Sequence, residues 1–183
     1  MAESEFFIGQ IFEETYPPEA AVHCNSHGDR YIKEIEKTAE GKRQFQIVAV
    51  PAPTLEEVKT QKLAELERKF LAWYETDATV TSSLGFVADS DSRAMMDTSG
   101  LVTTLEAQAE EARGTVAFMD HDNVPHQLTL DQMKTVNLEI IQNGQSAYAQ
   151  KWALRTAIEA AETTEAVNAI EIAFVGEDFS AAS

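Results

Sequence analysis

The feature that most constrains the fold is a run of ten positions near the C-terminal end, spaced alternately by three and four residues. In an α-helix this spacing places all ten side chains on one face, so the pattern predicts an amphipathic helix over about residues 130–161 with one continuous seam. A capping box, Thr129-Leu130-Asp131-Gln132, starts this helix. The seam positions are Leu130, Met133, Asn137, Ile140, Gly144, Ala147, Lys151, Leu154, Ile158 and Ala161.

A second capping box, Thr54-Leu55-Glu56-Glu57, predicts another long helix that ends near Tyr74. Its apolar residues share one face, so we expect the two capped helices to pack antiparallel. Asn137, Gly144 and Lys151 interrupt the seam, and polar seam residues commonly fix register or oligomeric state. The expected partner of the seam is the chain's own core, and self-association through the 130–161 helix is the alternative.

The remaining patterns predict an α+β protein in two parts. Residues 1–50 read as a small β-rich domain of β-α-β-β order, and residues 51–53 (Pro-Ala-Pro) as a linker. Residues 54–172 are expected to form a helical-hairpin body with a small antiparallel sheet, followed by a flexible tail at 173–183. Within the body we expect a strand over 80–88, a helical stretch over 92–112 broken at Gly100, and a hairpin around Asp120-His121-Asp122-Asn123.

Charge and composition argue against several classes of function. The net charge of −17 is spread along the whole chain and disfavours nucleic-acid binding, which requires clustered Lys and Arg. No apolar run approaches the roughly 20 residues of a membrane-spanning helix, so no membrane partner is expected. A single cysteine, Cys24, is typical of a chain that folds in a reducing cytoplasm. The acidity has two interpretations: a solvated surface, or a DNA mimic that inhibits a nucleic-acid enzyme.

Several segments resemble small proteins from the tail and tail-fibre gene regions of bacteriophages and prophages. The similar segments are Tyr16-Pro17-Pro18-Glu19-Ala20-Ala21, Cys24-Asn25, Tyr31-Ile32-Lys33-Glu34-Ile35, Gln44-Phe45-Gln46-Ile47-Val48, the stretch from Leu55 to Leu66, and Phe86-Val87-Ala88-Asp89-Ser90-Asp91-Ser92-Arg93. These proteins carry a C-terminal domain of unknown function, and the resemblance covers nearly the whole chain.

The resemblance implies a non-enzymatic tail accessory protein of the tail-fibre assembly or minor tail type. Its expected partner is a phage tail or tail-fibre protein, and its expected location is the host cytoplasm during assembly or the virion tail. The alternative from a different class is an acidic phage inhibitor of a host nucleic-acid enzyme. The family has no established active site, so no functional residue carries over and the partner-binding residues stay unassigned.

The sequence predicts no catalytic, metal or cofactor site. His23, Cys24 and His27 lie within five residues and cannot all face one zinc ion, and a fourth ligand is missing. His121 and His126 could share a metal only if the hairpin brought them together. Asp89-Ser90-Asp91 begins like a calcium loop, but Ala94 replaces the glycine and Gly100 the final glutamate that such a loop requires.

Overall fold

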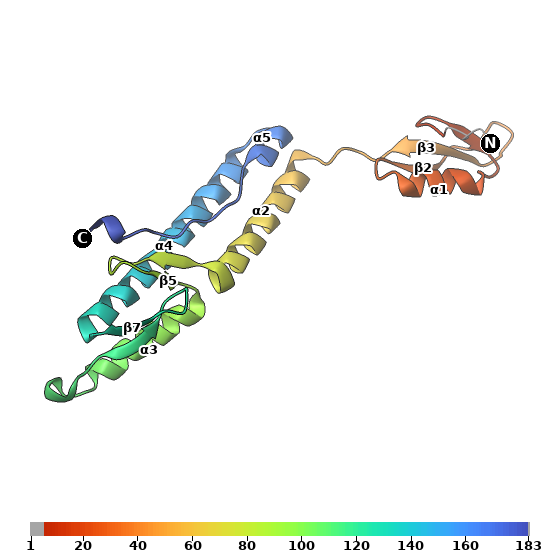
Figure 1. The fold of residues 1–183 in the computed structure, drawn as a ribbon. Coiled ribbons are helices and arrows are strands. Elements are labelled where there is room, and N and C mark those ends of the chain that lie inside the picture. The colour runs from red at the N-terminus through yellow and green to blue at the C-terminus, as the bar shows by residue number, and fades with distance from the viewer. Residues whose placement is uncertain (1–5, 183) are drawn as a thin grey trace. The chain divides into compact units, whose positions relative to one another are not determined.

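The computed structural model describes residues 6–182 and has an α+β fold. The chain divides into two compact units, residues 1–53 and residues 54–183, and Figure 1 draws both. The division coincides with the Pro-Ala-Pro segment, in which proline lacks an amide hydrogen and disfavours helix at the residue before it. Each unit has its own hydrophobic core.

The first unit is a three-stranded antiparallel sheet covered by one helix. Its elements are β1 (Ile11–Glu13), α1 (Pro18–Ser26), β2 (Arg30–Ile35) and β3 (Gln44–Ala49). The strand order is β1-β3-β2, so β3 is central and β1 and β2 are the edges. Pro18 suits the first turn of α1, where the missing amide has no intrahelical partner in any case. Phe6, Ala20, Cys24 and Ile47 form the buried core.

The second unit is organised along one helix of 31 residues, α4. Figure 1 shows α2 beside one half of α4, and α3 with the β6–β7 hairpin beside the other half. The elements in order are α2 (Leu55–Ala72), the π-helical turn η1 (Trp73–Asp77), β4 (Thr79–Thr81), β5 (Val87–Asp89), α3 (Ser92–Glu106), the 3-10 turn η2 (Glu110–Ala112), β6 (Val116–Met119), β7 (Pro125–Leu128), α4 (Leu130–Ala160), α5 (Thr164–Ala169) and the 3-10 turn η3 (Ser180–Ala182).

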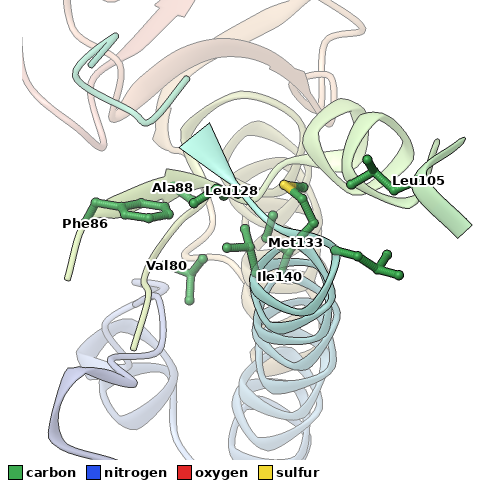
Figure 2. Close-up of a cluster of buried hydrophobic side chains, with 9 residues drawn as sticks. Val80, Phe86, Ala88, Leu105, Leu128, Met133 and Ile140 are labelled. Carbon is green, nitrogen blue, oxygen red and sulfur yellow. The ribbon is translucent and has the colours of Figure 1, made fainter. Parts of the chain in front are cut away.

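Two hydrophobic clusters lie along α4. The first surrounds its N-terminal half and joins α4 to β4, β5, β7 and α3; its residues are Val80, Phe86, Ala88, Leu105, Leu128, Leu130, Met133, Val136 and Ile140 (Figure 2). The second surrounds the C-terminal half and consists of Val58, Leu66, Ile158, Val167 and Ile172. Both capping boxes predicted from the sequence are formed, with Thr54 paired to Glu57 and Thr129 to Gln132.

All ten seam positions are buried or half-buried, so the expected burial of the seam in the chain's own core is confirmed. The polar interruptions have internal partners. Asn137 Oδ1 accepts hydrogen bonds from the Thr98 and Ser99 hydroxyls at 3.0 and 2.9 Å. Lys151 Nζ lies 2.7 Å from Glu67 Oε2 and 4.3 Å from the ring centroid of Phe70. These polar side chains thus fix the register of helices within one chain.

Two local predictions differ from the structure. The strand expected over 80–88 is instead the β4–β5 hairpin, which turns at Gly85, where φ is +88° and a glycine is favoured. Helix α3 continues through Gly100, because Met95 before that residue and Leu101 and Leu105 after it all pack on the core. Packing therefore overrides the low helix propensity of one glycine.

The second cluster gives a test of the seam. Ile158 is fully buried there, so Ile158→Ala is expected to reduce the free energy of unfolding by about 2–5 kcal/mol. Leu154→Ala, at a half-buried position beside it, costs about 2 kcal/mol. The exposed Gln142, further toward the N-terminus of the same helix, is the control, since Gln142→Ala changes stability by no more than about 0.5 kcal/mol. Urea unfolding followed by circular dichroism measures all three, and equal effects would contradict the packing described here.

Candidate functional site

A group of charged and polar side chains lies where α3, β5 and the β6–β7 hairpin meet. A hollow of about 250 Å³ opens there, lined by Asp89, Asp91, Arg93, Ala94, Asp97, Thr98, Leu101, Ala117, Phe118 and Met119. Its lining combines three aspartates and one arginine with apolar side chains. Asp91 already has a structural role, because its Oδ1 accepts the Ala94 amide at 2.7 Å and caps α3.

Two aspartate–histidine pairs flank this hollow. His121 Nδ1 lies 2.6 Å from Asp89 Oδ1, and the His121 amide donates to the Val87 carbonyl oxygen at 2.9 Å. His126 Nε2 lies 2.8 Å from Asp120 Oδ2, and its ring stacks on Phe86 at a centroid distance of 4.2 Å. Asp120 Oδ1 also accepts the Val124 amide at 2.8 Å, which closes the turn between β6 and β7. The contacts of His121 therefore hold the hairpin to β5, whereas the Asp120–His126 pair lies within the hairpin itself.

The electrostatics follow from these contacts. The carboxylate of Asp89 raises the pKa of His121 above its usual 6.5, first through the hydrogen bond and then through its charge. The hydrogen bond from His126 and that from the Val124 amide hold the pKa of Asp120 below its usual 3.8. The Asp120 contribution to stability is present above pH 3.8 and is lost as the pH falls through the lowered value.

A different polar cluster fastens the C-terminal segment to α4. Asn143 is buried; its Nδ2 donates to the Thr79 carbonyl oxygen at 3.2 Å and to Ser90 Oγ at 2.8 Å, and its Oδ1 accepts the Glu177 amide at 2.8 Å. One turn on, Ser146 Oγ hydrogen-bonds Glu177 Oε1. We refer to Thr79, Ser90, Asn143, Ser146 and Glu177 as the Asn143 cluster.

The segment after Ile172 continues this attachment, which differs from the flexible tail predicted at 173–183. Gln150 exchanges two hydrogen bonds with the backbone of Val175, at 2.9 and 3.1 Å. The Thr81 amide donates to the Glu177 carbonyl oxygen at 3.0 Å, and the Phe179 amide donates to the Thr81 carbonyl oxygen at 2.8 Å. The sequence did not predict these contacts. They are made by the backbone of the segment and do not depend on its small and acidic side chains.

The structure shows where the possible metal ligands named from the sequence lie. Cys24 lies in the core of the first unit, whereas His27 is exposed and its Nδ1 lies 2.8 Å from the His23 carbonyl oxygen. His121 and His126 are each paired with a separate aspartate. Within residues 6–182, no group of three or more His, Cys, Asp or Glu side chains is arranged to hold a metal ion.

The second unit is thus an α+β domain in which α4 is fastened to the β4–β5 and β6–β7 hairpins and to the segment of residues 173–182, here called the C-terminal strap. A family described as a domain of unknown function (DUF4376) matches residues 53–172, which is more than half of the chain. The chain belongs to this family. The matched range begins just before α2, ends just after α5, and includes only the last residue of the first unit. No curated protein and no solved structure matches the chain. None of the described helices is long and apolar enough to cross a membrane.

The Asp89–His121 pair makes a pH prediction. Because the pKa of His121 is raised in the folded state, the Asp89–His121 pair stabilises the fold fully below pH 6.5. This stabilisation is lost as the pH rises through the raised pKa. A ¹H–¹³C NMR titration of the His121 ring is expected to give a pKa above 6.5. Asp89→Asn removes the charged partner and should return the value toward 6.5. An unchanged His121 pKa in that variant would contradict the pairing.

The close approach of Gly176 to β4 leads to a prediction about how the C-terminal strap contributes to stability. A Cβ built on Gly176 would lie 2.0 Å from the Thr79 carbonyl oxygen, so any other residue forces the segment away from β4. Gly176→Ala is expected to cost about 1–3 kcal/mol and to raise amide exchange at Glu177 and Phe179. The control is Gly114→Ala, whose Cβ meets nothing within 4 Å. Hydrogen exchange read by mass spectrometry distinguishes the two, and similar protection in both variants would count against the strap.

Proposed function

We propose that this protein is a non-enzymatic accessory protein of a bacteriophage tail, which acts through protein–protein contacts, either as part of the virion or as an assistant in tail-fibre assembly. The resemblance of its segments to phage tail-region proteins supports this role. One structural observation carries the proposal further: the first unit presents a group of exposed apolar side chains beside an edge strand. Phe7, Ile8 and Ile11 form this group, and Phe7 is 60% exposed.

The position of these residues indicates how a partner would bind. β1 pairs with β3 on one side only and lies at the edge of the sheet. An edge strand can accept a further strand from another chain, with backbone hydrogen bonds for affinity and side-chain contacts for specificity. Exposed apolar groups beside such an edge are typical of interaction surfaces. The partner that fits is an extended segment of a tail or tail-fibre protein.

The charge arrangement favours this role over inhibition of a nucleic-acid enzyme. A DNA mimic needs uninterrupted rows of carboxylates that replace phosphates. In the second unit, lysine and arginine side chains lie among the carboxylates. Glu65 on α2 lies within 3.3 Å of both Lys62 and Lys69, and Lys134 lies 2.7 Å from Glu106. Arg155 likewise lies beside Glu159 on α4. Inhibition of a nuclease or restriction enzyme is the outcome that would favour the mimic.

The test combines location with binding. If the chain is part of the virion, mass spectrometry of purified virions is expected to find it there at fixed stoichiometry. If the chain assists assembly, mass spectrometry is expected to find it in infected cells and not in the virions. Co-expression with the neighbouring fibre gene should give a complex by affinity capture. Ile11→Asp is expected to reduce capture about tenfold or more, since it places a charge in the proposed contact.

The matched control is Val22→Asp on α1, which charges a side chain that is 67% exposed at another position of the same unit. This variant should retain full capture. The proposal fails if the fibre protein folds and assembles alone while this chain stays free, or if the Ile11 and Val22 variants bind equally well. Both variants need unchanged circular dichroism for the comparison to count.

A further inference from the structure

The C-terminal strap lies against the rest of the second unit in the way that a bound peptide would. It runs back from α5 along α4 to β4 (Figure 1). The residues that contact it by hydrogen bonds or by close backbone approach are here called the strap site: Thr79, Thr81, Asn143, Ser146 and Gln150. All five lie within residues 53–172, the range that matches the DUF4376 family, whereas the strap lies beyond it. The site therefore belongs to the family domain, and a separate segment fills it.

The backbone contacts of the strap are those of a strand added to the edge of a sheet. β4 pairs with β5 on one side. On its other side the Thr81 amide donates to the Glu177 carbonyl oxygen at 3.0 Å, and the Phe179 amide donates to the Thr81 carbonyl oxygen at 2.8 Å, in parallel orientation. Several classes of domain bind extended segments of other proteins by adding them to such an edge. The strap thus occupies the position on β4 at which a strand of another chain would add.

Two aromatic side chains anchor the strap at either end. Phe174 packs against the second hydrophobic cluster, with its ring centroid 5.4 Å from that of Phe70. Phe179 packs against the first cluster. Between these anchors, the side chains of Val175 and Asp178 are exposed and do not determine the fit. Aromatic residues are therefore required at two positions that are five residues apart.

The centre of the strap is recognised through shape and polar contacts. A Cβ on Gly176 would lie 2.0 Å from the Thr79 carbonyl oxygen, so only glycine fits there. The next residue is held twice, because the Glu177 amide donates to Asn143 Oδ1 at 2.8 Å and the Glu177 carboxylate accepts the Ser146 hydroxyl. The strap site therefore selects a glycine followed by a glutamate.

We propose that the strap site is a peptide-binding site for an extended segment of a partner protein with the pattern aromatic–x–Gly–Glu–x–aromatic, and that the chain's own strap keeps this site closed. A second copy of the chain is a poor source of the segment, because its strap already fills its own site and exchange between copies gains no contact. The attached strap has an effective concentration on the order of mM at the site. A partner segment therefore binds when the strap is loosened or when it fits better than the strap. This site is separate from the β1 edge of the first unit.

Binding of a peptide to the full chain tests the proposal. The probe is a fluorescently labelled synthetic peptide with the sequence of residues 171–182, and fluorescence anisotropy measures its affinity. Gly176→Ala in the chain loosens the attached strap. The probe is therefore expected to bind the Gly176→Ala chain about tenfold more tightly than the parent chain, in which the intact strap competes. Equal affinity for the two chains, or no binding to the variant at about 1 mM probe, overturns the proposal.

Two altered peptides test the recognition of the pattern. A peptide that carries Gly176→Ala is expected to bind the loosened chain about tenfold or more weakly than the unaltered probe, since its Cβ meets β4. A peptide that carries Val175→Ala is the matched control, because Val175 is 71% exposed, and its affinity should equal that of the probe. Equal affinities of the two altered peptides would contradict the proposed selectivity.

Hydrogen exchange shows where the probe binds. In the parent chain the Thr81 amide is hydrogen-bonded to the Glu177 carbonyl oxygen and should be protected. Gly176→Ala is expected to reduce this protection, and the unaltered probe is expected to restore it. Binding without restored protection places the probe elsewhere and overturns the proposal. Should the Gly176→Ala chain fail to fold by circular dichroism, Phe179→Ala, which removes one aromatic anchor, replaces it with the same expected results.

Discussion

The side chain of Asn143 is the contact on which the second unit depends. It lies in the middle of α4, is buried, and hydrogen-bonds three separate segments: β4, the residue that follows β5, and the C-terminal strap. A buried amide without partners would cost about 1–3 kcal/mol for each unsatisfied group, so these three segments must arrive together. The hydrophobic clusters provide most of the driving force, whereas the Asn143 cluster determines which segments occupy the space between them.

This arrangement explains how a helix as long as α4 remains part of one compact unit. Its N-terminal half is covered by α3 and the hairpins, and its C-terminal half by α2, α5 and Ile172. Neither cluster alone buries the whole seam. The Asn143 cluster lies where the two meet, next to Gly144, where a Cβ would lie 3.2 Å from the Met95 side chain and 3.6 Å from the Tyr74 hydroxyl. Helices from both halves therefore approach α4 closely at this point.

Periodicity and capping predicted the main elements because these signals are local. The seam of α4, both capping boxes and the β6–β7 hairpin all follow from residues close in sequence. The Asn143 cluster was missed because its partners are 34 to 64 residues away and two of them are backbone groups. The Asp89–His121 pair was missed for the same reason, since it joins residues 32 apart. No pattern within a helix indicates such contacts.

The positions of three side chains give each unit its own reporter. The single cysteine of the chain lies in the core of the first unit, and burial raises the pKa of its thiol. Both tryptophans, Trp73 and Trp152, belong to the second unit. Thiol labelling of Cys24 therefore follows the unfolding of the first unit alone, while tryptophan fluorescence follows the unfolding of the second unit alone. The chain can thus show directly whether its two units unfold together or in sequence, with none of its residues changed.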